Sequence, residues 1–320
     1  MPNPSVSLDR VHQIYSQPLL TLVFEAQTVH RQYQQANQVQ LCTLSNIKSG
    51  RCPEDCKYCA QSARYQTEVE SYPLISVDEV LEQAKVAKAN GSTRLCMGAA
   101  WRQAPQGAEF EQVLEMVRGV SSMGMEACVT LGMLQPDQAQ KLAEAGLKAY
   151  NHNLDTSENF YAEIITTRTY RDRLETIKNV AAAGIEVCCG GILGIGESES
   201  DRLELIHTLV NLDPQPTSIP INALVPIPGT PLAELPPIDP LVLVRVIATT
   251  RILLPQATIR LSAGRNLLST SDQALCFLAG ANSLFSSEKL LTTANPGLDL
   301  DVQMFDQLGL IPLEIDSAVA

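Results

Sequence analysis

The sequence has little positive charge and no long hydrophobic run. Its 320 residues contain 23 lysines and arginines against 35 aspartates and glutamates, which gives a formal net charge of −12. Proteins that bind nucleic acids present a basic face, so this composition argues against that class and suits a protein that handles small molecules. No apolar stretch reaches the length that crosses a bilayer, and residues 1–5 lack the features of a signal peptide. We therefore expect a cytoplasmic protein that engages neither nucleic acid nor membrane.

The chain also lacks low-complexity tracts and strict sequence repeats. Its hydrophobic fraction of 45% is ample for a large core. Nine cysteines in such a chain indicate reduced intracellular thiols rather than a disulfide framework. Metal binding is the simplest explanation for most of them.

A short apolar strand, a loop, an amphipathic helix and a glycine recur along the chain. Strands are predicted over 39–47, 93–98, 126–131, 148–153, 185–192, 218–222, 258–262 and 282–285. The helices that follow them are predicted over 76–91, 108–122, 136–146, 170–183, 198–211, 239–254 and 271–279. Eight strands that alternate with helices favour a TIM-type (β/α)8 barrel over an open doubly wound sheet.

Helical segments flank the predicted barrel on both sides. Two helices, broken near Pro18, are predicted over 8–35, and a last helix over about 299–308. We divide the chain into three parts. They are an N-terminal helical segment (1–37), the barrel (38–288) and a C-terminal extension that closes the barrel (289–320).

Three cysteines stand close together after the first predicted strand. Cys52, Cys56 and Cys59 have the spacing C-x3-C-x2-C. Thiolates spaced in this way suit zinc or an iron–sulfur cluster. A structural zinc site has four protein ligands, so three cysteines leave either an open metal position or a fourth ligand elsewhere. An open iron can bind and activate a small molecule, and a structural zinc is the alternative.

Polar side chains collect on one face of four further predicted strands, because strand residues alternate faces. The residues on this face are Cys96, Cys128, Cys188 and Arg260. They would point into the barrel, where a buried arginine needs an anionic or ligating partner. A second cluster held by the three thiolates would supply one. The alternative is that cysteines in strands are small buried hydrophobic residues, which is our interpretation of the others: Cys42, Cys189 and Cys276.

A glycine-rich run, 190–196, follows the fifth predicted strand. Its simplest explanation is a tight exit from the strand. Because barrel active sites lie at the carboxyl ends of the strands, we expect these glycines to allow the backbone close to a ligand.

Longer motifs match a known family. They are PEDCKYC at 53–59, CMGAAW at 96–101, YNHNLDT at 150–156, RLSAGR at 260–265 and LLTT at 290–293. The cysteine loop, with Tyr58 before its third cysteine, resembles the radical S-adenosylmethionine signature. The whole set, from about residue 8 to about residue 310, closely resembles the biotin synthase family of that superfamily.

The resemblance implies an enzyme with two iron–sulfur clusters. A 4Fe–4S cluster on Cys52, Cys56 and Cys59 would bind S-adenosylmethionine and cleave it reductively to a 5′-deoxyadenosyl radical. A 2Fe–2S cluster would be held by Cys96, Cys128, Cys188 and Arg260 and would be the sulfur source. The implied reaction, the last step of biotin biosynthesis, inserts sulfur between two unactivated carbons of dethiobiotin. A homodimer and a reduced flavodoxin or ferredoxin as electron donor are also implied.

The resemblance also suggests binding residues. Those implied for S-adenosylmethionine are Tyr58, Asn153, Asp155 and Arg173, and those for dethiobiotin are Asn153, Asn222, Thr292 and Thr293. Their ordinary alternatives are turns, caps, a solvated helix charge and a plain loop. We interpret His152 as structural, because its neighbours on both sides would face the pocket. The alternative functions are another radical S-adenosylmethionine enzyme, hydrogenase-maturase-like or methylornithine-forming, and an iron–sulfur carrier.

Overall fold

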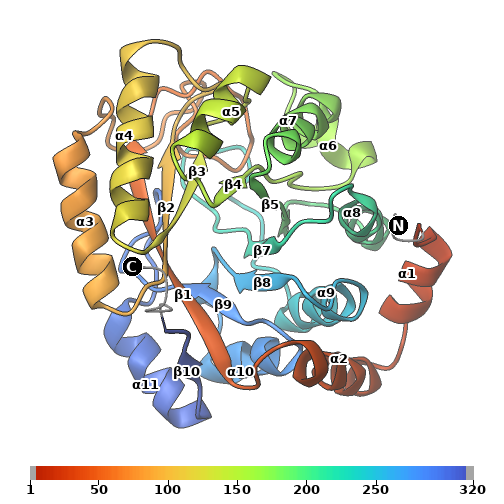
Figure 1. Ribbon diagram of the computed structural model, residues 1–320. Coiled ribbons are helices and arrows are strands. Elements are labelled where there is room, and N and C mark those ends of the chain that lie inside the picture. The colour runs from red at the N-terminus through yellow and green to blue at the C-terminus, as the bar shows by residue number, and fades with distance from the viewer. Residues whose placement is uncertain (1–4, 315–320) are drawn as a thin grey trace.

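The computed structural model describes residues 5–314 and shows parallel strands wrapped by helices (Figure 1). The outer ends of the first and last predicted segments, 1–4 and 315–320, lie outside the described residues. The strands are β1 (Gln38–Lys48), β2 (Arg94–Ala99), β3 (Glu126–Thr130), β4 (Ala149–Asn151), β5 (Glu186–Cys188), β6 (Gly191–Leu193), β7 (Ser218–Ala223), β8 (Thr258–Leu261), β9 (Ser283–Phe285) and β10 (Ile311–Pro312). Since β1 pairs with β2 on one side and with β9 on the other, the sheet closes into the predicted (β/α)8 barrel.

The helices lie close to their predicted positions. They are α1 (Leu8–Tyr15), α2 (Leu19–Tyr33), α3 (Val77–Ala89), α4 (Ala108–Ser122), α5 (Pro136–Glu144), α6 (Glu158–Ile164), α7 (Tyr170–Ala182), α8 (Glu199–Asn211), α9 (Pro240–Leu253), α10 (Thr270–Leu278) and α11 (Leu298–Leu308). A capping box at Ser76 and Glu79 starts α3, as predicted. Helix α6 was not predicted, because its seven residues are too few to show a helical period.

One predicted strand is wrong in detail. The segment 185–192 forms two short strands, β5 and β6, separated by Cys189 and Gly190. A Cβ atom on Gly190 would lie 1.9 Å from the Pro220 carbonyl oxygen of β7, and one on Gly191 would lie 2.9 Å from the Asp155 carbonyl oxygen. These two glycines allow close packing of protein backbone, and the expected approach of a ligand to the run 190–196 stays a prediction.

The two faces of the strands divide as the alternation predicts. Leu95, Met97 and Val129 belong to the large core between the barrel and its helices. A separate cluster fills the barrel interior, and its buried members are Cys42, Cys96, Cys128, Ala149, Cys188, Phe285 and Leu290. The cysteines that were predicted to point inward are thus gathered in the middle of the barrel.

Helices α1 and α2 and the strand β10 pack beside the barrel (Figure 1). Helix α2 packs along α9, and α1 packs against α8 and α9. After α11, the short strand β10 pairs with the beginning of β1, where Gln38 is opposite Ile311. In residues 5–314 we find no helix of the length and apolar character needed to span a membrane.

Candidate active site

A cavity of about 320 Å³ opens at the carboxyl ends of the strands. This is where barrel enzymes place their active sites. The predicted site residues that line it are Cys52, Cys56, Tyr58, Cys59, Cys96, Cys128, Asn153, Asp155, Arg173, Asn222, Arg260, Thr292 and Thr293. Cys188 does not line it but is fully buried on β5. The structure therefore brings together residues that are up to 241 positions apart in the sequence, from Cys52 to Thr293.

The cysteine loop is held by its own backbone. The Cys52 amide donates to the Gln61 carbonyl at 2.9 Å, and the Ala63 amide donates to the Cys52 carbonyl at 2.7 Å. Gly50, just before the loop, has a φ of +72°, and a Cβ atom there would lie 2.9 Å from Ser71. A glycine is needed at this turn for both reasons.

The chemistry of the three loop thiols fits an iron–sulfur cluster. Burial raises the pKa of Cys56 to about 11 and that of Cys59 to about 12, so these thiols keep their protons until a metal displaces them. In residues 5–314 no three histidine, cysteine or acidic side chains come together closely enough to hold one metal ion. Ligands of a zinc ion all contact one atom, whereas the loop thiolates would each contact a different iron. The absence of three ligands close enough for one metal ion within residues 5–314 favours a cluster over a structural zinc.

Asp155 is the centre of a buried polar group beside the loop. It follows β4 in a left-handed conformation with a φ of +69°. Its Oδ2 forms a close ion pair with Arg173 of α7 and accepts a hydrogen bond from the Tyr58 hydroxyl at 2.8 Å. The guanidinium of Arg173 also donates from Nε to the Tyr161 hydroxyl at 2.8 Å. Asp155 is therefore in direct contact with two other residues predicted for S-adenosylmethionine, Tyr58 and Arg173.

The other predicted binding residues surround the same cavity. Asn153 accepts a hydrogen bond from the Gly190 amide at 3.1 Å. Asn222, at the end of β7, donates to the Gly191 carbonyl at 3.0 Å and accepts from the Ala263 amide at 3.2 Å. Thr292 and Thr293 belong to the segment after β9 and line the cavity from there. The two asparagines thus have backbone contacts that fix their orientation.

The prediction for His152 was incomplete. Its side chain is 3% exposed, yet it lines the cavity. Burial, with Arg173 and Arg168 nearby, holds its pKa well below the usual value, so the imidazole is neutral. Its Nε2 atom finds no hydrogen-bond partner in the described part of the chain. The strand β4 ends at Asn151, so the alternation that we had extended to His152 no longer applies there.

The inner thiols lie on neighbouring strands at the same level. Cys96 of β2 is opposite Cys128 of β3. Arg260 of β8 approaches from the other side, with its Nη1 3.8 Å from the Cys188 sulfur. A hydrogen bond with Cys128 lowers the pKa of Cys188 strongly, although burial alone would raise it, and the positive charge of Arg260 adds to this effect.

The inner group also has unused hydrogen-bonding capacity. Arg260 is 1% exposed, and its Nη2 has no hydrogen-bond partner within residues 5–314. The same holds for the hydroxyl of Ser262. Buried polar groups without partners are rare in folded proteins. A 2Fe–2S cluster bound by the three thiolates would offer sulfides and iron to these groups, so the residues fit it.

One inner thiol was not given a role from the sequence. Cys42 of β1 is fully buried in the same cluster as the predicted ligands. Its sulfur lies 3.6 Å from the Ser283 hydroxyl, which also contacts Arg260. Only the position of β1 between β2 and β9 reveals this, because Cys42 belongs to no motif that we recognised.

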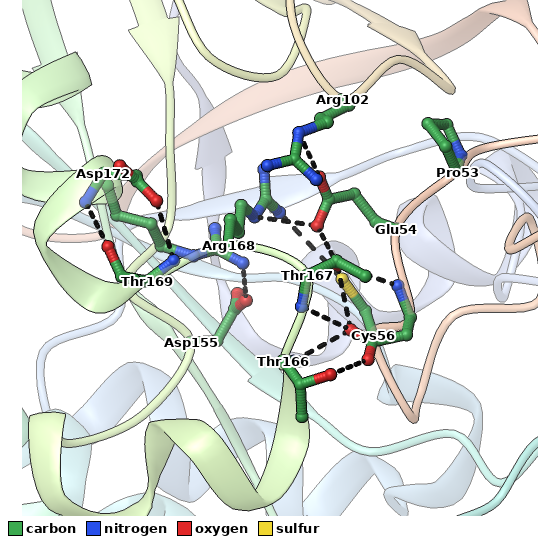
Figure 2. Close-up of polar contacts among 12 residues, drawn as sticks. Pro53, Glu54, Cys56, Arg102, Asp155, Thr166, Thr167, Arg168, Thr169 and Asp172 are labelled. Atoms are coloured by element: carbon green, nitrogen blue, oxygen red, sulfur yellow. Dashed lines mark hydrogen bonds and ion pairs between the residues drawn. The ribbon is translucent and has the colours of Figure 1, made fainter.

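The segment before α7 clasps the cysteine loop (Figure 2). The Asp55 carboxylate accepts from the backbone amides of Thr166 at 2.9 Å and Thr167 at 3.2 Å, and from both of their hydroxyls. Burial alone would raise the pKa of Asp55, but these hydrogen bonds lower it to about 2. Sequence reasoning missed this contact, since the two segments are more than 100 residues apart.

Comparisons with known proteins place these features in context. Residues 46–209 match the family described as the radical SAM superfamily, where SAM denotes S-adenosylmethionine. Residues 220–311 match the biotin and thiamin synthesis associated domain. The chain is 66% identical over 309 residues to a biotin synthase of Synechococcus sp. (strain JA-3-3Ab), covering 97% of this chain and 100% of that protein. It is 58% identical to a biotin synthase of Gloeobacter violaceus, covering 97% of this chain and 98% of the relative.

Solved structures show the same fold at much lower identity. A methylornithine synthase superposes with a TM-score of 0.81 at 18% identity, over 97% of this chain and 95% of that chain. A hydrogenase maturase from Carboxydothermus hydrogenoformans superposes with a TM-score of 0.80 at 16% identity, over 98% of this chain and 77% of that chain. These two likenesses establish the fold alone.

Proposed function

The chain belongs to the biotin synthase family, and from this membership we propose how its residues divide the work of sulfur insertion. It is a radical S-adenosylmethionine enzyme that converts dethiobiotin to biotin. The observation that carries the proposal is the presence of two separate thiol sets along one cavity. One set is in the loop after β1, and the other is in the barrel interior beside Arg260.

Each thiol set has its own task in this proposal. Cys52, Cys56 and Cys59 hold a 4Fe–4S cluster, while Cys96, Cys128, Cys188 and Arg260 hold a 2Fe–2S cluster. When bound, the two clusters supply an electron for cleavage of S-adenosylmethionine and the sulfur atom that enters the product. The side chains of the protein position the reactants. They do not break the C–H bonds themselves, because an acid, base or nucleophile of the protein cannot break an unactivated C–H bond.

S-adenosylmethionine binds beside the loop in this proposal. Asp155 accepts from the ribose hydroxyls, and Arg173 pairs with the carboxylate. Tyr58 packs by the adenine, and Asn153 lies near both ribose and substrate. The contacts among Asp155, Arg173 and Tyr58 support this, since they hold each group in place before the ligand arrives.

Dethiobiotin binds between the two thiol sets in this proposal. Asn222 hydrogen-bonds the ureido ring, and Thr292 and Thr293 bind the carboxylate at the mouth. The apolar side chains of Phe285 and Leu290 line the same cavity and exclude water from the reacting carbons.

Further parts of the proposal concern the whole molecule. We propose that the chain works in the cytoplasm as a homodimer and takes electrons from a reduced flavodoxin or ferredoxin. All nine cysteines are free thiols, which is consistent with a reducing compartment. We also propose that 1–37, 38–288 and 289–320 act as a helical lead-in, the catalytic barrel and a closing extension.

Anaerobic turnover tests the proposed function. Protein reconstituted with iron and sulfide is mixed with S-adenosylmethionine, dethiobiotin and a reductant, and biotin and 5′-deoxyadenosine are measured. Iron and sulfide analysis of the same sample gives the cluster content. Formation of both products supports the proposal, whereas deoxyadenosine without biotin would point to a different substrate for this scaffold.

A further inference from the structure

A buried carboxylate lies inside the cysteine loop. Glu54, between Cys52 and Cys56, is 2% exposed and faces two arginines from other segments (Figure 2). Its Oε1 is 3.5 Å from Nε of Arg102, which follows β2. Its Oε2 is 3.7 Å from Nε of Arg168, which precedes α7. The Arg102 side chain is 44% exposed, whereas that of Arg168 is 9% exposed.

Arg168 reaches past Glu54 to one of the loop thiols. Its Nη2 lies 4.0 Å from the sulfur of Cys56. Its Nε has no hydrogen-bond partner among the described residues, and the residue lines the main cavity. The hydrogen bonds from Thr166 and Thr167 to Asp55 fix the segment that carries it. A permanent positive charge is thus held between a carboxylate and a thiol.

We propose that Arg168 is a positioning residue that acts through Cys56 to favour the reduced state of the loop cluster. This inference rests on the proposed 4Fe–4S cluster. Reduction transfers one electron from the donor to the cluster, so the negative charge on the cluster and its thiolates increases by one. A nearby guanidinium that is shielded from water lowers the free energy of that state. Hydrogen bonds to the cluster sulfurs act in the same direction.

Glu54 has the opposite charge and a second task. It holds Arg168 in place, but its own negative charge disfavours reduction. Removing the two charges one at a time therefore has opposite effects on the reduction potential. A residue that only supports the fold would not produce this reversal of sign.

The test is a redox titration that measures the reduction potential of the loop cluster. Electron paramagnetic resonance monitors the titration, and S-adenosylmethionine is left out. In Arg168→Met we expect the equilibrium constant for one-electron reduction to fall about tenfold, which is a decrease of about 59 mV. In Glu54→Gln we expect a rise of similar size. Arg168→Lys keeps the positive charge, so its reduction potential should lie close to that of the wild type. Arg171→Met is the matched control, because Arg171 is exposed on α7. The reduction potential of the cluster in this variant should equal that of the wild type.

The outcomes separate this inference from the proposed function. Shifts of opposite sign for Arg168→Met and Glu54→Gln support it. Unchanged potentials in both variants, or shifts of the same sign, overturn the inference. The proposed 4Fe–4S cluster is not contradicted by that result. If Arg168→Met takes up no iron, Glu54→Gln decides alone, and a fall or no change in its potential overturns the inference. Wild-type protein that forms no 4Fe–4S cluster would instead contradict the proposed function.

Discussion

Ser283 of β9 contacts Arg260 of β8 at the centre of the barrel, where the Arg260 Nε donates to the Ser283 hydroxyl at 3.1 Å. This hydrogen bond directs the guanidinium toward Cys188. It arises because β8 and β9 are neighbours in the sheet and Arg260 is directly opposite Ser283 in the register. The orientation of Arg260 therefore depends on a residue outside the motifs quoted above from this sequence.

The first prediction concerns this contact. Ser283→Ala leaves the Arg260 Nε without its partner, which costs about 1–3 kcal/mol for a buried donor. We expect the protein to fold but to lose the 2Fe–2S absorbance faster than the wild type during anaerobic incubation. Ser122→Ala, on the exposed end of α4, is the control and should match the wild type. Equal rates of loss for Ser283→Ala and the control would contradict the prediction.

The second prediction separates the two clusters. Cys128→Ala removes the thiol that lies opposite Cys96 on the neighbouring strand. We expect the 2Fe–2S absorbance to disappear while the 4Fe–4S signal remains, because the loop cysteines do not depend on β3. Iron and sulfide analysis with absorbance spectroscopy measures this. Cys276→Ala, a buried cysteine on α10 outside the cavity, is the control with both clusters expected. A spectrum of Cys128→Ala like that of the wild type would end the two-cluster assignment.

The third prediction concerns Asp155. Asp155→Ala removes the acceptor predicted for ribose and leaves Arg173 unpaired, and breaking a buried ion pair costs about 3–5 kcal/mol. We expect the affinity for S-adenosylmethionine to fall more than that for dethiobiotin. Asp155→Asn keeps the shape of the side chain and should show the same order with less loss of stability. Equilibrium binding of each ligand checks this, and a greater loss for dethiobiotin would reassign the residue.

The fourth prediction concerns the pH dependence of stability. His30 of α2 is buried, and its Nδ1 finds no hydrogen-bond partner in residues 5–314. Burial, followed by the charges of Arg251 and Arg31, lowers its pKa from 6.5 to about 4. Below pH 6.5 the unfolded chain therefore binds a proton that the folded chain does not. The free energy of unfolding should then decrease by up to about 1.4 kcal/mol per pH unit, from 6.5 down to 4.

Denaturant unfolding of His30→Gln and the wild type at pH 7.5 and pH 5.5 measures the effect of that histidine. We expect the wild type to lose more stability than His30→Gln between these two pH values, because only the wild type has the imidazole of His30. The clusters contribute equally to both proteins, so their own response to acid cancels in the comparison. His12→Gln, at an exposed position of α1, should behave as the wild type. If His30→Gln and the wild type lose the same stability between the two pH values, the lowered pKa of His30 is not the cause of the pH dependence.

Local patterns predicted most of the fold. The period of the apolar residues, the capping box at Ser76 and Glu79 and the glycines after helices placed nearly every helix within a few residues. Some elements were missed or merged because their signals are weak, among them the two-residue strand β10. Helix α6 has only seven residues, and the break between β5 and β6 depends on how closely β7 approaches Gly190.

The sequence alone determined the residue types, the order of the strands and helices, and the alternation that turns Cys96, Cys128 and Arg260 inward. These follow from periods of two and 3.6 residues, which are local properties of the chain. The tertiary structure decided which distant residues meet. Barrel closure places Cys42 and Ser283 beside the inner thiols, and the segment before α7 brings Arg168 to Cys56. Such contacts depend on the register and packing of separate segments, which no local pattern encodes.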